Sequence, residues 1–171
     1  DSHEWLRQQF TELEDLLHAV SVLGIPGREV LERIQGLGEV YSSRLLADLM
    51  RQQGSDVARL DARDVLVVRE AELGVSVDWD ESAARLAEWR NRHPQSRIVV
   101  TGFIARDGNG RPTTLGRNGS DFSGAIFAAL FDAAELHIWT DVDGVLSADP
   151  RVVPEAVPLA ALSYHEAFEL A

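Results

Sequence analysis

The feature that most constrains the fold is a nearly continuous apolar run, Ile-Val-Val-Thr-Gly-Phe-Ile, at residues 98–104. Its β-branched residues favour a strand, and the lack of polar alternation indicates a strand buried on both faces, as inside a parallel sheet. Parallel strands need long crossover connections, which are usually helices. If helical segments flank this run, the chain should form an α/β domain with a mainly parallel sheet.

Helical segments are indeed predicted on both sides of the run. Apolar residues recur at steps of three and four over residues 3–22, 28–53 and 80–92. Within the second segment, two glycines each cost a helix roughly 1 kcal/mol relative to alanine, so we expect a break at residues 35–39. The rest of the chain is predicted to contain a strand at 57–60, a turn at 61–64, a hairpin turn at 107–110, a helix at 120–132, a strand at 136–140, a non-helical connector at 149–158 and a final helix with a capping box at 163–166.

The composition is that of an ordinary globular protein and excludes several classes of partner. The formal net charge is −12 and the cationic residues are spread out, whereas nucleic-acid binding needs clustered Lys and Arg, so we expect no nucleic-acid partner. No apolar run approaches the roughly 20 residues that span a bilayer, and no leader-like segment opens the chain, so we expect no membrane association and a cytoplasmic location. The chain has no cysteine and its five histidines share no ligand spacing, so we expect no zinc site and assign no residue as a metal ligand.

The first candidate site is the segment Thr-Leu-Gly-Arg-Asn-Gly-Ser-Asp at residues 114–121. Asn118 and the following glycine tolerate positive φ, and Ser and Asp are good helix caps, so a helix should begin near Ser120. The free N–H groups of that helix favour an anion, and Arg117 stands one turn earlier, where it can bind a carboxylate or a phosphate. From these residues alone, a capped helix behind a turn is an equally good interpretation.

The second candidate site follows the predicted strand at residues 136–140. Thr140 and Asp141 end that strand, and Asp-Pro-Arg follows at residues 149–151. In open α/β sheets, ligands bind beyond the carboxyl ends of the strands. The alternative is an ordinary acidic turn. The chain contains neither a P-loop nor a dinucleotide-binding fingerprint, so a nucleotide would have to be bound by other means.

Four motifs together resemble those of the aspartate kinases, which belong to the amino-acid kinase family. In chain order they are Gly-Leu-Gly-Glu at 36–39, Val-Thr-Gly-Phe-Ile at 100–104, Leu-Gly-Arg-Asn-Gly-Ser-Asp at 115–121, and Trp-Thr-Asp-Val-Asp-Gly at 139–144 leading to Ala-Asp-Pro-Arg at 148–151. Asn118 makes the third motif most similar to that of the bifunctional aspartokinase–homoserine dehydrogenases. The resemblance covers essentially the whole chain.

The resemblance implies a three-layer α/β/α amino-acid kinase fold, with residues 1–171 forming part of a catalytic domain. It implies transfer of the γ-phosphoryl group of ATP, with Mg²⁺, to the side-chain carboxylate of L-aspartate. The product is 4-phospho-L-aspartate, the first intermediate of lysine, threonine and methionine biosynthesis. It also implies a homo-oligomer.

The resemblance assigns three residues to aspartate. Arg117 binds its α-carboxylate, Glu39 receives its ammonium group, and Phe103 lines the pocket through its backbone. This assignment agrees with simple electrostatics, because an amino-acid zwitterion needs one fixed cation and one fixed anion.

The remaining assignments concern the transfer step and the nucleotide. By the match, Ser120 and Asp121 face the reacting groups, and Asp121 orients catalytic lysines or magnesium. Thr140, Asp141 and Arg151 fall on the nucleotide side. Phosphoryl transfer needs little covalent chemistry from the protein and much positioning and charge neutralisation.

Two departures from the family pattern affect these expectations. Leu146 replaces the aromatic residue usual at that position, and the chain contains no lysine, whereas the family opens with a Lys-Phe-Gly-Gly phosphate loop. That loop and the C-terminal regulatory domains are not in the sequence, so we expect these 171 residues alone to be inactive. Two alternatives stay open: a kinase-like binding or regulatory module without turnover, and a related amino-acid kinase that acts on another acid.

Overall fold

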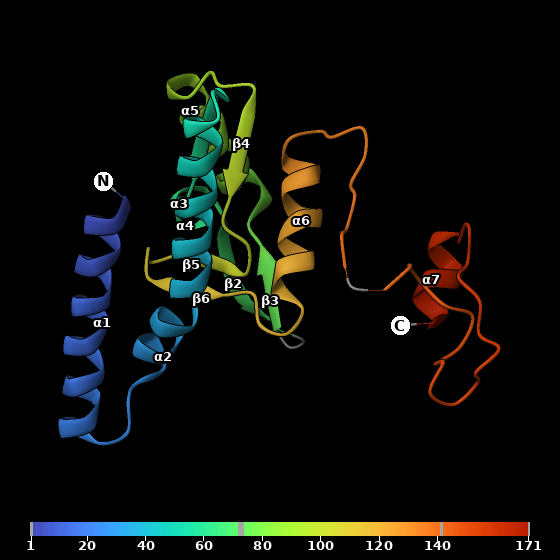
Figure 1. Ribbon diagram of the computed structural model, residues 1–171, viewed down its shortest axis with the longest axis horizontal. Coiled ribbons are helices and arrows are strands. Elements are labelled where there is room, and N and C mark those ends of the chain that lie inside the picture. Colours follow the sequence, from blue (N-terminus) through green and yellow to red (C-terminus); the bar gives the residue numbers. More distant parts are fainter. Residues whose placement is uncertain (1, 72–73, 141, 171) are drawn as a thin grey trace. The chain divides into compact units, whose positions relative to one another are not determined.

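The computed structural model describes residues 2–71, 74–140 and 142–170, and the chain divides into two compact units. The first unit is Asp1–Leu136 and the second is His137–Ala171. The first unit holds all the strands among the described residues, with helices packed around them (Figure 1). The second unit holds one short helix and a series of turns.

Three helices open the first unit as predicted: α1 (Ser2–Leu23), α2 (Arg28–Gln35) and α3 (Leu37–Gln52). The expected break falls at Gly36, and the structure gives its reason. A Cβ atom on Gly36 would lie 2.7 Å from Cγ2 of Ile104, so the junction of the two helices approaches a core strand too closely for a side chain.

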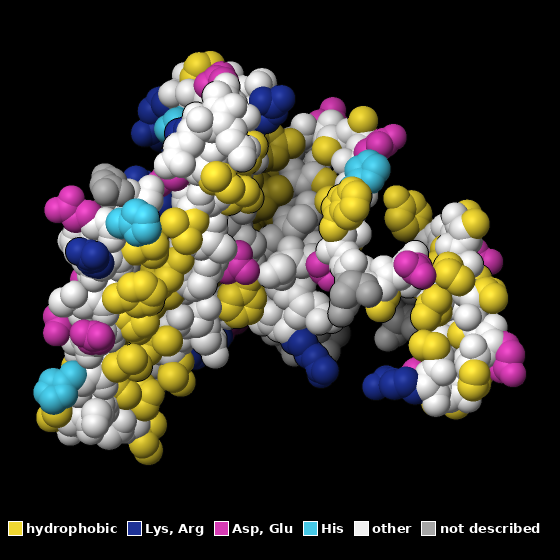
Figure 2. Space-filling view, viewed as in Figure 1, with side chains coloured by type: hydrophobic (Ala, Val, Ile, Leu, Met, Phe, Trp, Pro, Cys, Tyr) yellow, Lys and Arg dark blue, Asp and Glu magenta, His cyan; other side chains and the backbone are white. Residues whose placement is uncertain are grey.

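Helix α1 packs on α3 through aromatic rings, because the Tyr41 ring lies 5.8 Å from that of Trp5 and 5.8 Å from that of Phe10. Hydrophobic side chains gather along the face of α1 that is in view (Figure 2). None of the helices in the described part of the chain is long and apolar enough to cross a membrane.

Among the described residues of the first unit, six strands form two sheets. In the smaller sheet, β1 (Val57–Leu60) pairs in parallel with β4 (Arg97–Val100). The larger sheet has the order β3-β2-β5-β6, with a parallel β2–β5 pair between two antiparallel pairs; its strands are β2 (Val67–Ala71), β3 (Gly74–Val77), β5 (Ile104–Asp107) and β6 (Pro112–Thr114). The predicted α/β class is confirmed, and so is the hairpin turn between β5 and β6.

The prediction of one continuous strand over residues 98–104 is wrong. The run is divided between β4 and β5, which belong to different sheets, and residues 101–103 turn the chain between them. Phe103 has φ 61°, which no regular strand allows. A run of apolar residues indicates only that a segment is buried. Here β4 and β5 both pack against the same core, so the apolar run gave no sign of the turn between them.

Two further helices cover the sheets. Helix α5 (Trp79–Arg92) begins as predicted, with the Asp78 carboxylate accepting the Glu81 N–H at 3.2 Å. Helix α6 (Gly119–Leu130) follows the motif at residues 114–121. The expected turn at 61–64 is a one-turn helix, α4 (Ala62–Val65). The largest fully buried apolar side chains, which anchor the core, are Leu60, Leu66, Ile104, Ile126, Val65, Val67 and Val68.

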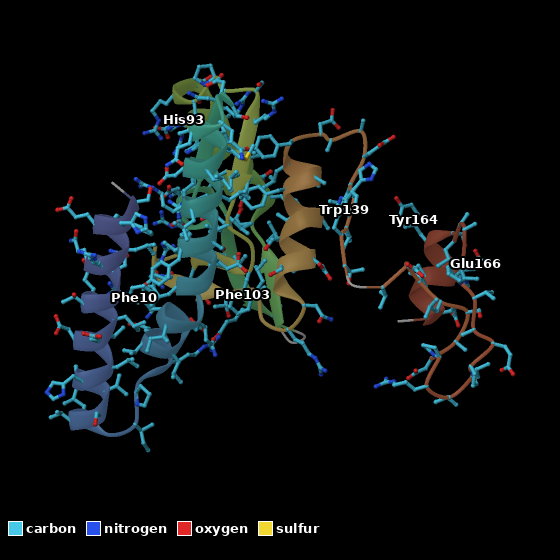
Figure 3. All side chains as sticks on the ribbon, in the orientation of Figure 1. Phe10, His93, Phe103, Trp139, Tyr164 and Glu166 are labelled. Atoms are coloured by element: carbon cyan, nitrogen blue, oxygen red, sulfur yellow. The ribbon has the colours of Figure 1, made fainter. Side chains whose placement is uncertain are left out.

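The prediction of a strand at residues 136–140 is also wrong. Residues 136–140 adopt irregular backbone, and Trp139 is 92% exposed (Figure 3). The apolar residues of this segment gave a strand pattern, but a short apolar run does not by itself determine the backbone conformation. Residues 149–158 form the predicted non-helical connector.

The final helix, α7 (Tyr164–Leu170), begins with the predicted capping box. The Ser163 hydroxyl accepts the Glu166 N–H at 3.2 Å, and the Glu166 carboxylate accepts the Ser163 N–H at 2.8 Å. These bonds hold the pKa of Glu166 below its usual value, with the backbone bond from Ser163 as the main cause.

Candidate active site

Glu39 joins three separate parts of the first unit at one point. It lies in the first turn of α3, and its Oε2 accepts the backbone N–H of Gly102 at 3.0 Å, just beyond the end of β4. Its Oε1 accepts a hydrogen bond from the Ser120 hydroxyl at 3.3 Å, in the first turn of α6. A Cβ atom on Gly102 would lie 3.3 Å from Glu39 Oε2, so glycine leaves room for this contact. The hydrogen bonds that its two carboxylate oxygens accept therefore fix the position of the half-buried Glu39 side chain.

The chain reverses direction at Phe103 through a γ-turn. Its φ is 61°, and the N–H of Ile104 donates to the carbonyl of Gly102 at 2.6 Å across it. The form of γ-turn with positive φ is rare and strained. Phe103 lies between the beginnings of α3 and α6 (Figure 3). The turn thus brings a backbone segment and an aromatic ring to the same place as Glu39 and Ser120.

Ser123 supports this turn, and sequence reasoning missed it. Its Oγ accepts the Phe103 N–H at 2.7 Å and donates to the Gly119 carbonyl at 2.7 Å, and the side chain is buried. A usable signal was present, because Ser123 is a polar residue on the buried face of an otherwise apolar helix.

The loop before α6 adopts the left-handed conformation that its sequence predicts. Gly116 has φ 77° and Asn118 has φ 58°. The N-cap of α6 is Asn118, and its side chain makes no capping hydrogen bond. Ser120 and Asp121, which were expected to cap the helix, instead lie inside its first turn. The N–H groups of that turn are not occupied by an N-cap side chain, which suits an anionic ligand.

A cavity of about 330 Å³ opens at this helix start, within the range of about 300–1,000 Å³ usual for small-molecule sites. It is lined by Phe103 and residues 116–121. One cation, Arg117, and one anion, Asp121, line it together with Ser120, which links it to Glu39. The structure therefore brings together all five of the sequence-predicted residues that lie in the first unit.

Charged groups at the end of β1 hold the helix that carries Glu39. Arg59 donates to the Ser43 hydroxyl at 3.0 Å and to the Val40 carbonyl at 3.3 Å, both on α3.

Burial alone would raise the pKa of Asp61, but hydrogen bonds from Arg63, at 2.6 and 2.8 Å, outweigh it and hold that pKa below its usual value.

The predicted nucleotide-side residues belong to the second unit. Thr140 lies in its exposed opening segment, and Asp141 lies outside the described residues. The Arg151 guanidinium is bound to the Asp149 carboxylate at 2.7 and 3.0 Å, and these bonds lower the pKa of Asp149. The Asp-Pro-Arg segment therefore forms a self-contained turn that presents one paired guanidinium.

No group of three or more His, Asp or Glu side chains that could hold a metal ion occurs among the residues that the structure describes. This arrangement still suits Mg²⁺ bound together with a nucleotide, because Mg²⁺ commonly takes one or two carboxylates and completes its shell with phosphates and water. Asp121, in the first turn of α6 at the cavity, can supply one such carboxylate.

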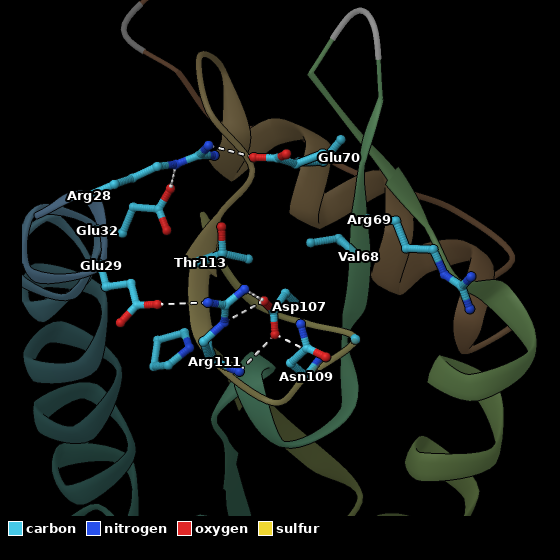
Figure 4. A pocket seen from close by; sticks show the side chains of 13 residues that line it. Arg28, Glu29, Glu32, Val68, Arg69, Glu70, Asp107, Asn109, Arg111 and Thr113 are labelled. Atoms are coloured by element: carbon cyan, nitrogen blue, oxygen red, sulfur yellow. Dashed lines mark hydrogen bonds and ion pairs between the residues drawn. The ribbon is translucent and has the colours of Figure 1, made fainter.

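A larger cavity, of about 630 Å³, lies between α2 and the antiparallel pairs β2–β3 and β5–β6 of the larger sheet (Figure 4). Most of its charged groups bind one another, and Arg69 pairs with Asp78 outside the cavity. Arg28 pairs with Glu32 and Glu70, and Arg111 pairs with Glu29 at 2.9 Å and with Asp107 at 2.9 Å. A charged ligand would have to displace these pairs, so we interpret the region as a set of ion pairs that joins α2 to these strand pairs.

Comparison with known proteins agrees with the motifs. The model of a family described as the amino acid kinase family matches residues 6–171. The chain is 45% identical over 166 residues to the bifunctional aspartokinase/homoserine dehydrogenase 1, chloroplastic, of Arabidopsis thaliana, covering 96% of this chain and 18% of that protein. It is 44% identical over 142 residues to the bifunctional aspartokinase/homoserine dehydrogenase 2 of Escherichia coli (strain K12), covering 83% of this chain and 17% of that protein.

Solved structures give the same result. The crystal structure of E. coli aspartokinase III in complex with aspartate and ADP superposes with a TM-score of 0.80 at 30% identity, covering 94% of this chain and 37% of that one. The aspartate kinase from Synechocystis superposes with a TM-score of 0.67 at 31% identity, covering 92% of this chain and 26% of that one. These findings confirm the resemblance that the four motifs predicted. The chain spans about a fifth of the length of the curated relatives named above.

Proposed function

Because this chain belongs to the amino acid kinase family, we propose that it forms part of the catalytic domain of an aspartate kinase. The reaction is transfer of the γ-phosphoryl group of ATP to the side-chain carboxylate of L-aspartate. The observation that carries the proposal is the cavity at the start of α6, where Arg117 provides a cation and Ser120 connects to the Glu39 carboxylate.

The charges of this site match those of an amino-acid zwitterion. The Arg117 guanidinium can bind the α-carboxylate through two parallel hydrogen bonds. Glu39 already has both oxygens oriented by Gly102 and Ser120, and it can accept from the α-ammonium group without further ordering. With both ends of the amino acid held, the side-chain carboxylate is the part left free to react. The length of side chain that the cavity accommodates would then determine whether the substrate is aspartate or a longer acidic amino acid.

In the transfer step, a side-chain carboxylate oxygen of aspartate attacks the γ-phosphorus. The bond from that phosphorus to the bridging oxygen breaks, and ADP leaves with the electron pair. Ser120 and Asp121, in the first turn of α6, are the proposed groups that face the reacting atoms. Bound Mg²⁺, held in part by Asp121, would neutralise charge on the phosphates. Such positioning and charge neutralisation account for most catalysis of phosphoryl transfer.

Three further assignments complete the proposal. Thr140, Asp141 and Arg151 contribute to nucleotide binding, in keeping with the ADP named for the solved E. coli aspartokinase III complex. The protein functions as a homo-oligomer, which light scattering after gel filtration can test. Its location is the cytoplasm, whereas the plant relatives carry the word chloroplastic in their names, so fractionation or fluorescent tagging can distinguish the two.

The experiment that tests the site is a comparison of Arg117 variants in the full-length protein. Arg117→Ala should raise the KM for aspartate by at least about tenfold, because a substrate carboxylate loses a charged partner worth roughly 1.5–3 kcal/mol. Arg117→Lys should recover only part of this loss, since an ammonium group cannot bind both carboxylate oxygens in a fork. An unchanged KM for aspartate in the Ala variant would remove Arg117 from the site.

A second candidate function is a kinase-like binding module without turnover, which the absence of lysine in this chain favours. Calorimetric binding of aspartate by the full-length protein with no ADP release would establish that alternative. The two functions therefore share the aspartate site and differ in the transfer step.

A further inference from the structure

Phe103 adopts a conformation that a bulky side chain disfavours, and it does so at the proposed aspartate site. Its φ is 61°, in the left-handed region that favours glycine. Residues held in such conformations persist only when the surrounding structure fixes them, and they cluster at functional sites. Contacts with the surrounding structure therefore hold Phe103 in place.

Its backbone is bonded on both sides. The Phe103 carbonyl accepts the N–H of Leu115 at 2.8 Å, and the Phe103 N–H donates to the Ser123 hydroxyl at 2.7 Å. The first bond is between backbone groups and survives most substitutions. The second depends on one side chain.

Ser123 is suited to hold this bond with little freedom. The residue is only 3% exposed, and its hydroxyl donates to the Gly119 carbonyl at 2.7 Å while it accepts the Phe103 N–H. Because the hydrogen is committed to Gly119, a lone pair of Oγ is directed at Phe103. A serine hydroxyl that donates to a carbonyl of the preceding helical turn usually does not stabilise the helix. The contribution of Ser123 therefore comes from the hydrogen bond that it accepts from the Phe103 N–H.

The peptide group between Gly102 and Phe103 transmits this constraint to the site. The group is planar, so fixing the Phe103 N–H also fixes the Gly102 carbonyl and the course of the chain through Gly102. The N–H of Gly102 binds Glu39 Oε2 at 3.0 Å. The bond to Ser123 therefore constrains the backbone that carries the Phe103 ring, and with it the Gly102 residue whose N–H binds Glu39.

We propose that Ser123 is a positioning residue for aspartate binding, which holds the γ-turn at Phe103 and, through it, Glu39. This inference rests on the proposed function, since it concerns the same site. Ser123 does not line the cavity. Its loss should therefore act on aspartate affinity through the geometry of other groups, and should leave the nucleotide unaffected.

The test compares Ser123→Ala with a matched control, Ser82→Ala, in the full-length protein. Ser82 is also a buried helical serine whose hydroxyl accepts the backbone N–H of a strand residue, Val67, at 3.0 Å, but it lies on α5, outside the site. Both variants should lower Tm. Ser123→Ala alone should raise the KM for aspartate, by about tenfold for an N–H left without a partner, with the KM for ATP unchanged.

Two further variants isolate the hydroxyl from side-chain size. Ser123→Thr keeps the hydroxyl and should retain near-normal aspartate KM, whereas Ser123→Val has the same shape as Thr and should behave like the Ala variant. Amide hydrogen exchange at Phe103 should accelerate in Ser123→Ala and in Ser123→Val, which reports the bond itself without any substrate.

A Ser123→Ala protein with a normal aspartate KM, or with equal rises in the KM for aspartate and for ATP, would overturn the inference. So would an equal effect of Ser82→Ala on the aspartate KM. The proposed function fails instead if the wild-type full-length protein releases no ADP when it is given ATP, Mg²⁺ and aspartate, so the wild-type assay tells the two failures apart.

Discussion

Replacing Glu39 by Gln removes one charge from the site and leaves its hydrogen bonds nearly intact. The Gln carbonyl can accept the Gly102 N–H, which Glu39 accepts at 3.0 Å, and the Gln amide can donate to the Ser120 hydroxyl, which then turns to become the acceptor. The fold should therefore lose little stability. The substrate ammonium loses its charged partner, worth roughly 1.5–3 kcal/mol, so the Kd for aspartate should rise about 10- to 100-fold.

The assay is isothermal titration calorimetry of the full-length protein with aspartate and, separately, with a non-hydrolysable ATP analogue. Glu32→Gln is the matched control, because Glu32 carries the same charge on the neighbouring helix α2 and pairs with Arg28 at 2.7 Å. It should leave aspartate affinity unchanged. Equal losses of aspartate and nucleotide affinity in Glu39→Gln would show that Glu39 is structural and would refute the reasoning.

Two further predictions concern the support of the site. Gly119→Ala should lower Tm and abolish aspartate binding, because its Cβ would lie 2.8 Å from Cδ2 of Phe103; calorimetry that finds normal binding would contradict this close packing. The pKa of Asp61 lies below its usual value in the folded state, so its ion pair stabilises the fold above about pH 4 and the stability is lost as pH falls through the lowered pKa. Denaturant unfolding between pH 7 and pH 3 should show a smaller acid destabilisation in Asp61→Asn than in the wild type.

Much of the helical structure could be predicted because it depends on local periodicity. The apolar spacing of α1, α3 and α5 is visible within one window of sequence, and so is the capping box at Ser163. The glycine interruption before α3 was also visible, although its cause was not. That cause is Ile104, which lies far along the chain from Gly36.

What the sequence could not reveal depends on contacts between distant segments. The turn at Phe103 is held by Leu115 and Ser123, and nothing within residues 98–104 distinguishes it from a continuous strand. Likewise, Glu39 and Ser120 are far apart along the chain, and only the family resemblance placed them in one site before their hydrogen bond was known. Ser123 was missed because the resemblance marked residues that face a substrate and left out those behind them.

The most direct test of the account is phosphorus NMR of the full-length protein incubated with ATP, Mg²⁺ and L-aspartate. An acyl-phosphate signal of 4-phospho-L-aspartate should grow with ADP, and no such signal should appear when L-aspartate is omitted or when Arg117→Ala replaces the wild type at low aspartate concentration. ADP formation that is independent of aspartate, or an acyl phosphate formed equally well with L-glutamate, would contradict it.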